Sequence, residues 1–183
     1  IKLTDKEGTY MIRIVIAEDQ ELLLGAMGSL LNLEEDMEVV GQASNGEEAL
    51  SLVHLLQPDV CIMDIEMPEM SGLEAAEALR SFGCKVIILT TFARSGYYRR
   101  ALQAEVSGFL LKDSPSEELA NSIRSINNGD KIYNAELIDE DPIDQKQDME
   151  VIQQHQLLKE QTKINTVRNY LTTILDKIKL PTG

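Results

Sequence analysis

The sequence lacks the features of a membrane-spanning or secreted protein. No apolar run in it approaches the roughly 18 residues that a membrane-spanning helix needs. Residues 1–10 have no apolar signal-peptide core, and we interpret them as an extension before a natural start at Met11. Only two cysteines are present, Cys61 and Cys84, each in or beside an apolar segment. We therefore expect buried, reduced thiols and a cytoplasmic location.

Several catalytic signatures are also missing. The chain contains no phosphate-binding P-loop, no dinucleotide-binding glycine pattern and no nucleophile elbow. Its two histidines, His54 and His155, have no partner at the spacing of a metal or catalytic site. We interpret both as solvated or helix-face residues.

The net charge of −14 is unevenly distributed. Residues 1–142 carry 11 Lys/Arg and 26 Asp/Glu, whereas residues 143–183 carry 6 Lys/Arg and 5 Asp/Glu. Because a strongly acidic surface repels the phosphate backbone, the first part is not expected to bind nucleic acid. Any such binding would fall to the C-terminal tail.

Residues 11–129 alternate between strand-like and helix-like segments. Near-continuous apolar runs predict parallel strands that are buried on both faces. The five predicted strands are 12–17, 37–41, 59–63, 86–90 and 107–111. Together with the helical spacing between them, they predict an α/β fold, a doubly wound (flavodoxin-like) five-stranded parallel sheet. Residues 130–145 are expected to be a linker, and residues 146–183 a small all-α tail.

Two of the predicted strands end abruptly in carboxylates. Glu18 and Asp19 follow the strand at 12–17, and Asp64 follows the strand at 59–63. Because the carboxyl ends of parallel strands meet at one edge of a sheet, we expect these side chains to converge. Two such charges about 4 Å apart repel by roughly 4 kcal/mol at an effective dielectric constant of about 20, so the cluster does not stabilise the fold. It predicts a site for a hard cation such as Mg²⁺, which prefers oxygen ligands.

Further short motifs follow at the ends of the later strands. Asp64 is followed by Met67-Pro68 and Gly72, and Leu89-Thr90 and the segment GFLLK (108–112) come next. In this order the set resembles the receiver domain of bacterial two-component response regulators, over the whole of residues 11–129. The segments IAEDQ, IMDIEMP, ILTTFAR and LLKDSPSEELANSIRS are similar to LuxR/NarL-type regulators of the lipid-desaturase thermosensor class.

This resemblance implies a phosphorylation site. Asp64 would accept a phosphoryl group from a sensor histidine kinase and form an acyl phosphate. Mg²⁺ would be held by Asp19, by Asp64 and by the backbone carbonyl of Glu66, with Glu18 acting through water. Lys112 would contact a phosphoryl oxygen as a point charge. The phosphorylated form would be a homodimer.

Thr90 and Phe109 form the expected switch. The Thr90 hydroxyl would bind another phosphoryl oxygen, and Phe109 would rotate into the space that Thr90 leaves. Two positions depart from the usual pattern, because Glu66 adds a carboxylate beside the site and Asp113 replaces the proline often found after the lysine. Without the other motifs, the site residues would be interpreted as ordinary positions: Asp64 as a loop residue, Lys112 as a solvated charge, Thr90 as a strand residue and Phe109 as a core aromatic.

The tail is predicted to form two helices, at 149–163 and 166–178. The second resembles the recognition helix of a LuxR/NarL-type helix-turn-helix domain, although the tail is shorter than that domain usually is. Arg168, Asn169 and Thr172 share the face that would reach promoter DNA. The opposite apolar stripe would pack on the domain core: Val167, Leu171, Ile174, Leu175 and Ile178. The alternative is an amphipathic helix that packs on the receiver.

The sequence as a whole predicts a transcription regulator that is switched by phosphorylation and is not an enzyme. A first alternative is a receiver that acts through protein contacts without binding DNA. A second is an Mg²⁺-dependent aspartyl phosphatase of the dehalogenase type, for which Glu66 would be the second acid two residues after Asp64.

Overall fold

A computed structural model describes residues 10–91, 94–113, 116–133 and 150–179. The expected extension at 1–10 and the expected linker at 130–145 lie largely outside these ranges. None of the helices in the described part of the chain is both long enough and apolar enough to cross a membrane.

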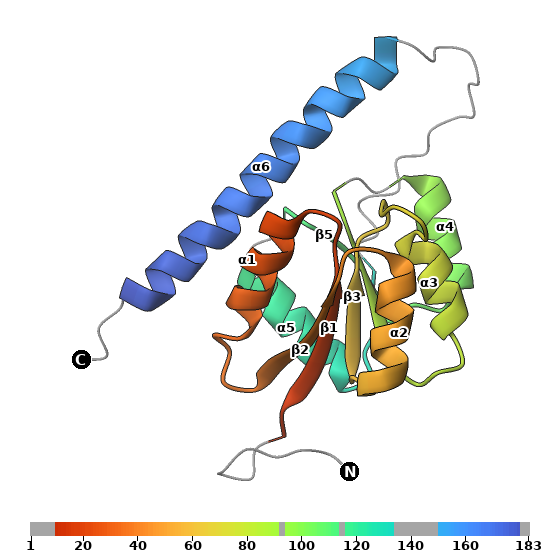
Figure 1. Cartoon of the computed structure of the whole chain (residues 1–183), viewed down its shortest axis with the longest axis vertical. Coiled ribbons are helices and arrows are strands. Elements are labelled where there is room, and N and C mark those ends of the chain that lie inside the picture. Colours follow the sequence, from red (N-terminus) through yellow and green to blue (C-terminus); the bar gives the residue numbers. More distant parts are fainter. Residues whose placement is uncertain (1–9, 92–93, 114–115, 134–149, 180–183) are drawn as a thin grey trace.

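The centre of the fold is a parallel sheet with strand order β2-β1-β3-β4-β5-β6 (Figure 1). Its strands are β1 (Ile12–Ala17), β2 (Met37–Ala43), β3 (Val60–Met63), β4 (Lys85–Thr90), β5 (Gly108–Leu111) and β6 (Ile132–Tyr133). The predicted doubly wound, flavodoxin-like fold is confirmed, but the sheet has one strand more than the five predicted. β6 lies in the range expected to be a linker. It consists of two residues paired with Gly108 and Phe109, so it is too short to show an alternating pattern.

Helices cover both faces of the sheet (Figure 1). The first five are α1 (Glu21–Leu31), α2 (Gly46–Leu56), α3 (Gly72–Leu79), α4 (Ser95–Gln103) and α5 (Ser116–Asn127). α1 and α5 pack on one face, and α2, α3 and α4 pack on the other, so the core divides into two apolar clusters. Local sequence fixes the helix starts. Asn45 accepts a hydrogen bond from the backbone N–H of Glu48, and Ser71 and Glu74 form a capping box at α3.

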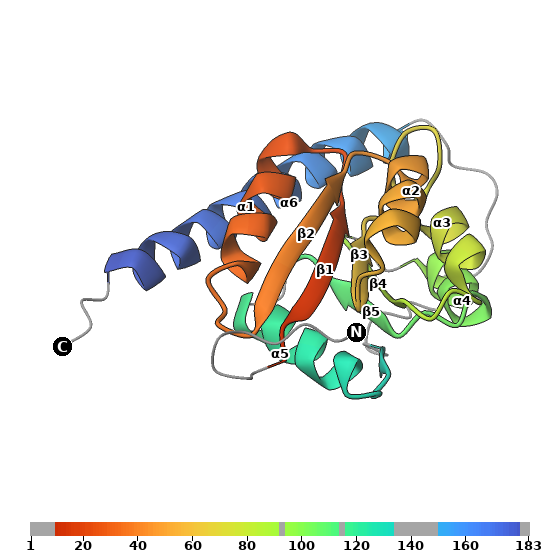
Figure 2. The same cartoon turned by 60° about the horizontal axis from the view of Figure 1, so that its bottom comes forward.

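The tail forms one continuous helix, α6 (Glu150–Lys179), which lies beside α1 (Figures 1 and 2). The predicted break between 163 and 166 is absent, because residues 150–179 contain neither glycine nor proline and the helical hydrogen bonds continue. A turn between two helices, as in a helix-turn-helix, is therefore not formed within α6. The helix packs on the receiver, as the alternative interpretation of the tail expected.

The packed face of α6 is narrower than the predicted stripe. Val167 and Tyr170 join the apolar cluster under α1 and α5, and Ile174 packs against it. Three members of the predicted stripe are instead exposed: Leu171, Leu175 and Ile178. The spacing of i, i+3 and i+7 aligns the packed residues on one line of the helix, whereas the exposed three lie on the flank of that line.

Candidate functional site: an acidic cluster at the carboxyl ends of the strands

The acidic cluster lies where the chain order of the sheet reverses. β1 lies between β2 and β3, which is the point at which doubly wound sheets form their sites. Ala17 and Met63 are paired residues of β1 and β3, so the next residues, Glu18 and Asp64, emerge at the same edge. The Asp64 N–H also donates to the Ala17 carbonyl (3.0 Å). Sheet register therefore brings these two side chains together.

Three carboxylates converge at this edge. One oxygen from each of Glu18, Asp19 and Asp64 lies within 4.8 Å of the others. Glu18 is fully buried, Asp64 is 6% exposed and Asp19 is exposed. A set of hard oxygen ligands with one open side fits a divalent cation that keeps part of its water shell. The cluster therefore has the donor chemistry and the access that Mg²⁺ requires.

Lys112 reaches the same cluster from the end of β5. Its backbone N–H donates to the Thr90 carbonyl (2.8 Å), which aligns it with the end of β4. The Lys112 ammonium forms ion pairs with Glu18 and with Asp64, the latter at 3.1 Å between Nζ and Oδ1. Only 2% of Lys112 is exposed. One buried cation is thus shared by two buried carboxylates that come from different strands.

Burial and these charges shift the protonation of the site. Burial raises the pKa of Glu18 to about 7; Lys112 opposes this effect and Asp64 adds to it. For Lys112, burial alone would lower the pKa, but the charges of Asp64 and Glu18 raise it above its ordinary value. Lys112 therefore stays charged at neutral pH, and the Glu18 carboxyl titrates close to neutrality.

The two expected switch residues, Thr90 and Phe109, lie in β4 and β5, which pair with each other. Thr90 ends β4 and is 4% exposed, and Phe109 lies in β5 and is fully buried. The Phe109 ring makes an edge-on contact with Tyr98 of α4, with 5.6 Å between ring centroids. A movement of Phe109 would therefore be transmitted to α4.

The Glu66 side chain contacts α4. Its carboxylate accepts a hydrogen bond from the Tyr97 hydroxyl (3.1 Å), and among the described residues it is not a member of the cluster of metal-ligating groups. The metal role that the sequence assigned to Glu66 concerns its backbone carbonyl, which this side-chain contact leaves unchanged.

The loop after Asp64 is held close to the start of α3. The Gly72 N–H donates to the Ile65 carbonyl (3.1 Å), and a Cβ atom at Gly72 would lie 1.9 Å from the Asp64 carbonyl oxygen. Only glycine fits this approach between two backbone segments. Gly72 therefore allows the start of α3 to lie close to Asp64, the expected phosphorylation site.

The three predicted DNA-contacting residues are far from the cluster in sequence and lie on α6. Arg168, Asn169 and Thr172 are all exposed, and the Thr172 hydroxyl donates to the Arg168 carbonyl (2.8 Å). Sequence reasoning missed Tyr170, which is 2% exposed and packs toward the sheet. Tyr170 could have been found from its position three residues after Val167, which places both on the same face of a helix. It was missed because the predicted apolar stripe contained aliphatic residues alone.

Comparisons with known proteins identify the family of this chain. Residues 14–124 match the model of the response regulator receiver domain. The chain is 55% identical to the transcriptional regulatory protein DesR of Bacillus subtilis, over 93% of this chain and 92% of that relative. It is 50% identical to the uncharacterized transcriptional regulatory protein YvfU of the same organism, over 92% and 91%.

Solved structures show the same receiver fold. A LuxR-family DNA-binding response regulator from Staphylococcus aureus superposes with a TM-score of 0.62 and 41% identity, covering 64% of this chain and 100% of that one. The signal receiver domain of the putative regulator NarL from Mycobacterium tuberculosis gives 0.63 and 32%, covering 65% and 98%.

Proposed function

The chain belongs to the response regulator receiver family, and from this premise we propose that it is a transcription regulator switched by phosphorylation of Asp64. The observation that supports this role best is the buried arrangement of Asp64, Glu18 and Lys112 beside the exposed Asp19. A phosphoacceptor needs a carboxylate nucleophile and positive charge around it, and the cluster has both.

The proposed reaction is a phosphoryl transfer. An Asp64 carboxylate oxygen attacks the phosphorus of a phosphohistidine on a sensor kinase, the P–N bond breaks, and the histidine leaves with the electron pair of that bond. Lys112 contacts a phosphoryl oxygen, and Thr90 donates its hydroxyl to another. Asp19, Asp64 and the backbone carbonyl of Glu66, with Glu18 acting through water, would hold Mg²⁺, whose positive charge would offset the repulsion between the two anionic reactants.

The proposed output is transcription control through α6. Relatives named as transcriptional regulators align over more than nine tenths of the chain, tail included. The exposed Arg168, Asn169 and Thr172 would contact promoter DNA, and we propose a homodimer as the phosphorylated form, located in the cytoplasm with its kinase partner. Such a protein holds a phosphoryl group and does not turn over phosphate esters.

Asp19→Asn is expected to weaken Mg²⁺ binding by roughly ten-fold or more, because it removes the negative charge of the one exposed carboxylate in the cluster of Glu18, Asp19 and Asp64. Titration calorimetry on the full chain measures this affinity. Asp113→Asn is the matched control, since Asp113 is an exposed carboxylate next to Lys112 and outside the cluster. Equal affinities for the two variants would contradict the assignment of Asp19 as a ligand.

The proposed DNA binding by α6 is tested by measuring the affinity for promoter-sized DNA at several salt concentrations and plotting log affinity against log salt concentration. The beryllofluoride-treated chain is expected to bind with an affinity that falls as salt rises, and Arg168→Ala should reduce the slope by about one counterion. Arg99→Ala, an exposed arginine on α4, should leave the slope unchanged. A slope of zero would favour a receiver that acts through protein contacts, and catalytic turnover of a phosphate ester would favour the phosphatase.

A further inference from the structure

A cavity of about 310 Å³ lies between α5, the β5–β6 edge of the sheet and α6, and we call it the α5 cavity. Its walls come from the ends of β4 and β5, from β6, from one side of α5 and from Tyr170 of α6. A water molecule takes about 30 Å³ in the liquid, so the cavity has room for roughly ten heavy atoms. This volume is at the lower end of the range for small-molecule sites and suits a small ligand.

The floor of the α5 cavity is apolar. Leu89, Leu110 and Leu119 line it and are 2%, 5% and 3% exposed. Leu111 and Ile132 also line the cavity. Burial of apolar surface favours binding roughly in proportion to the area that is removed from water. The floor therefore selects a ligand with an apolar body.

The mouth of the α5 cavity is polar. Glu118, Asn121, Ser122 and Ser125 follow one another at helical spacing along the same side of α5. Glu118 and Asn121 are exposed, and the two serines are half-buried. A carboxylate, an amide and two hydroxyls thus surround the opening. A few polar groups around an apolar interior orient the ligand in sites of this kind.

A buried polar side chain inside the cavity lacks a protein partner. Tyr170 is 2% exposed, and its phenol hydroxyl forms no hydrogen bond with the residues that the structure describes. Buried polar groups in folded proteins nearly always have a hydrogen-bond partner. Because the Tyr170 hydroxyl can both donate and accept, a polar group of a ligand in the cavity would supply the missing partner.

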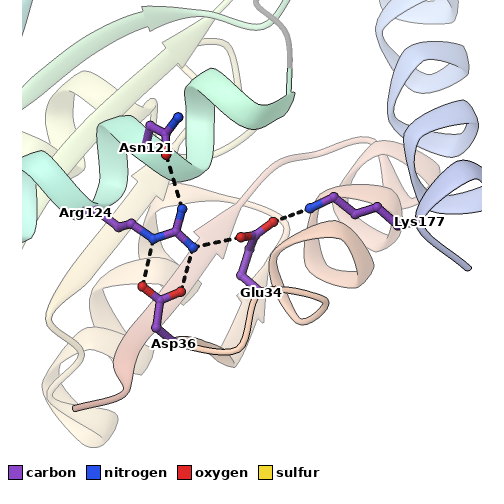
Figure 3. Close-up of polar contacts among 5 residues, drawn as sticks. All are labelled: Glu34, Asp36, Asn121, Arg124 and Lys177. Carbon is purple, nitrogen blue, oxygen red and sulfur yellow. Dashed lines mark hydrogen bonds and ion pairs between the residues drawn. The ribbon is translucent and has the colours of Figure 1, made fainter. Parts of the chain in front are cut away.

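The charges around the cavity disfavour an anionic ligand. Lysine and arginine are absent from the described residues that line it. Arg124, the basic residue of α5, is already bound, because its guanidinium contacts Glu34 (2.7 Å), Asp36 (2.7 Å) and the Asn121 side-chain oxygen (3.2 Å) (Figure 3). Lys177 of α6 also pairs with Glu34. Neither cation is free to bind an anion in the cavity.

Carboxylates, in contrast, border the cavity. Glu118 lies at the mouth. Burial raises the pKa of the Tyr170 phenol, and the charges of Glu18 and Asp113 add to this rise, which places both carboxylates near the phenol. An apolar space bordered by negative charge favours a cation with an apolar body. An ammonium group, which is compact and carries three donors, matches the single exposed carboxylate of Glu118.

The α5 cavity also adjoins two residues of the acidic site. Leu89 directly precedes Thr90, and Leu111 directly precedes Lys112. A ligand that contacts these leucines would therefore lie beside the strand ends that carry the proposed phosphoryl contacts. Its positive charge would partly offset the negative field of the acidic cluster.

We propose that the α5 cavity binds a small amphipathic cation, which has an ammonium group at one end of an apolar body and a hydrogen-bonding group at the other. Glu118 pairs with the ammonium group, the leucine floor covers the body, and Tyr170 bonds the far group. The bound ligand speeds phosphorylation of Asp64, because its charge eases the approach of an anionic phosphodonor. This last part rests on the proposed function of Asp64.

Binding is measured by NMR titration of the full chain with tyramine, a phenol joined to an ethylammonium group. We expect saturable shifts of the backbone amides that line the cavity, with a Kd on the order of 1 mM for a ligand of this size. Tyrosol has a neutral hydroxyl in place of the ammonium group and should bind about three-fold more weakly. Equal affinities for tyramine and tyrosol would overturn the choice of a cation. Shifts that do not saturate, or that spread over the acidic surface, would overturn the site.

Two pairs of variants locate the ligand. Glu118→Gln should reduce the affinity for tyramine to that of tyrosol, whereas Glu117→Gln, at an exposed carboxylate outside the lining, should leave it unchanged. The wild type should bind tyramine about three-fold more tightly than 2-phenylethylamine, which lacks the phenol hydroxyl. Tyr170→Phe should remove this difference, and Tyr98→Phe on α4 should preserve it. Equal effects within either pair would contradict the proposed placement.

The effect on phosphorylation is tested with the same ligands. Saturating tyramine should speed labelling of Asp64 by a small phosphodonor about two-fold, the effect of one charge about 10 Å away in water, while tyrosol should not. If tyramine binds in the cavity but the labelling rate is unchanged, the coupling is wrong and the proposed function stands. If Asp64 is not labelled with or without tyramine, the proposed function itself fails, whereas the binding site is judged by the titration alone.

Discussion

Replacing Lys112 with methionine is expected to lower the free energy of unfolding by about 3–5 kcal/mol at pH 8, the usual cost of removing one partner from a buried ion pair. Methionine keeps most of the side-chain volume, so the loss reflects charge. Glu18 and Asp64 would be left buried without the cation they share. The remaining carboxylate charges would then repel each other in a site that water reaches poorly.

The dependence of this loss on pH distinguishes the charge effect from a packing defect. The pKa of Glu18 is already raised to about 7, and removing Lys112 raises it further. A carboxyl whose folded pKa lies above its unfolded value of 4.5 costs no stability below pH 4.5, where it is protonated in both states. The cost grows as pH rises from 4.5 to the folded pKa, because the unfolded state ionises first in that range. The variant should therefore lose more stability at pH 8 than at pH 5.

Urea denaturation at the two pH values measures both quantities. Lys131→Met is the matched control, since Lys131 is exposed and the same atoms are exchanged. That variant should stay within about 0.5 kcal/mol of the wild type. If Lys112→Met were as stable as Lys131→Met, or if its loss were the same at both pH values, the buried shared cation would not be a feature of the folded protein.

Gly72→Ala is expected to reduce both stability and phosphorylation. The added Cβ atom would lie 1.9 Å from the Asp64 carbonyl oxygen and 2.9 Å from the carbonyl carbon. These are backbone atoms, so the start of α3 and the loop after Asp64 must move apart. Such overpacking costs about 1–3 kcal/mol, occasionally more. A displacement of about 1 Å at a reacting group lowers a rate by roughly 100-fold, which is the loss expected in the labelling rate of Asp64.

Gly25→Ala provides the contrast. A Cβ atom at Gly25 of α1 meets no atom within 4 Å, and the position is exposed. Alanine is the better helix former by about 1 kcal/mol, so this variant should be slightly more stable than the wild type and should be labelled at the same rate. Chemical denaturation and the rate of labelling by a small phosphodonor test both variants. An unchanged labelling rate in Gly72→Ala would show that the loop tolerates the displacement.

The central part of the fold could be predicted from the sequence because its signals are local and repeated. Each buried strand is an apolar run that ends at a polar residue, and parallel pairing then fixes which ends meet. For this reason the strand pattern alone was enough to place Glu18 and Asp64 together. The pairing of Lys112 with Glu18 was not predicted. It depends on the length and path of a flexible side chain that reaches across from β5.

The parts that were missed depend on distant contacts. β6 is two residues long, and its contacts are with distant parts of the chain: it pairs with β5, Ile132 packs against the core and Tyr133 contacts the ring of Tyr98. A second tail helix was predicted to begin at Thr166, but Thr166 is 1% exposed within a continuous α6. Tyr170 is buried because α6 docks on the apolar cluster under α1 and α5. A pattern within the tail alone does not contain that information.

Mass-spectrometric labelling of the full chain with a small phosphodonor and Mg²⁺ tests the central claim most directly. We expect one phosphoryl group per chain, located at Asp64, and none after Asp64→Asn or when Mg²⁺ is chelated. Asp59→Asn, a change of the same kind at the other end of β3, should leave labelling intact. Labelling of Asp64→Asn to the wild-type level, or modification of the wild type at another residue, would contradict the account.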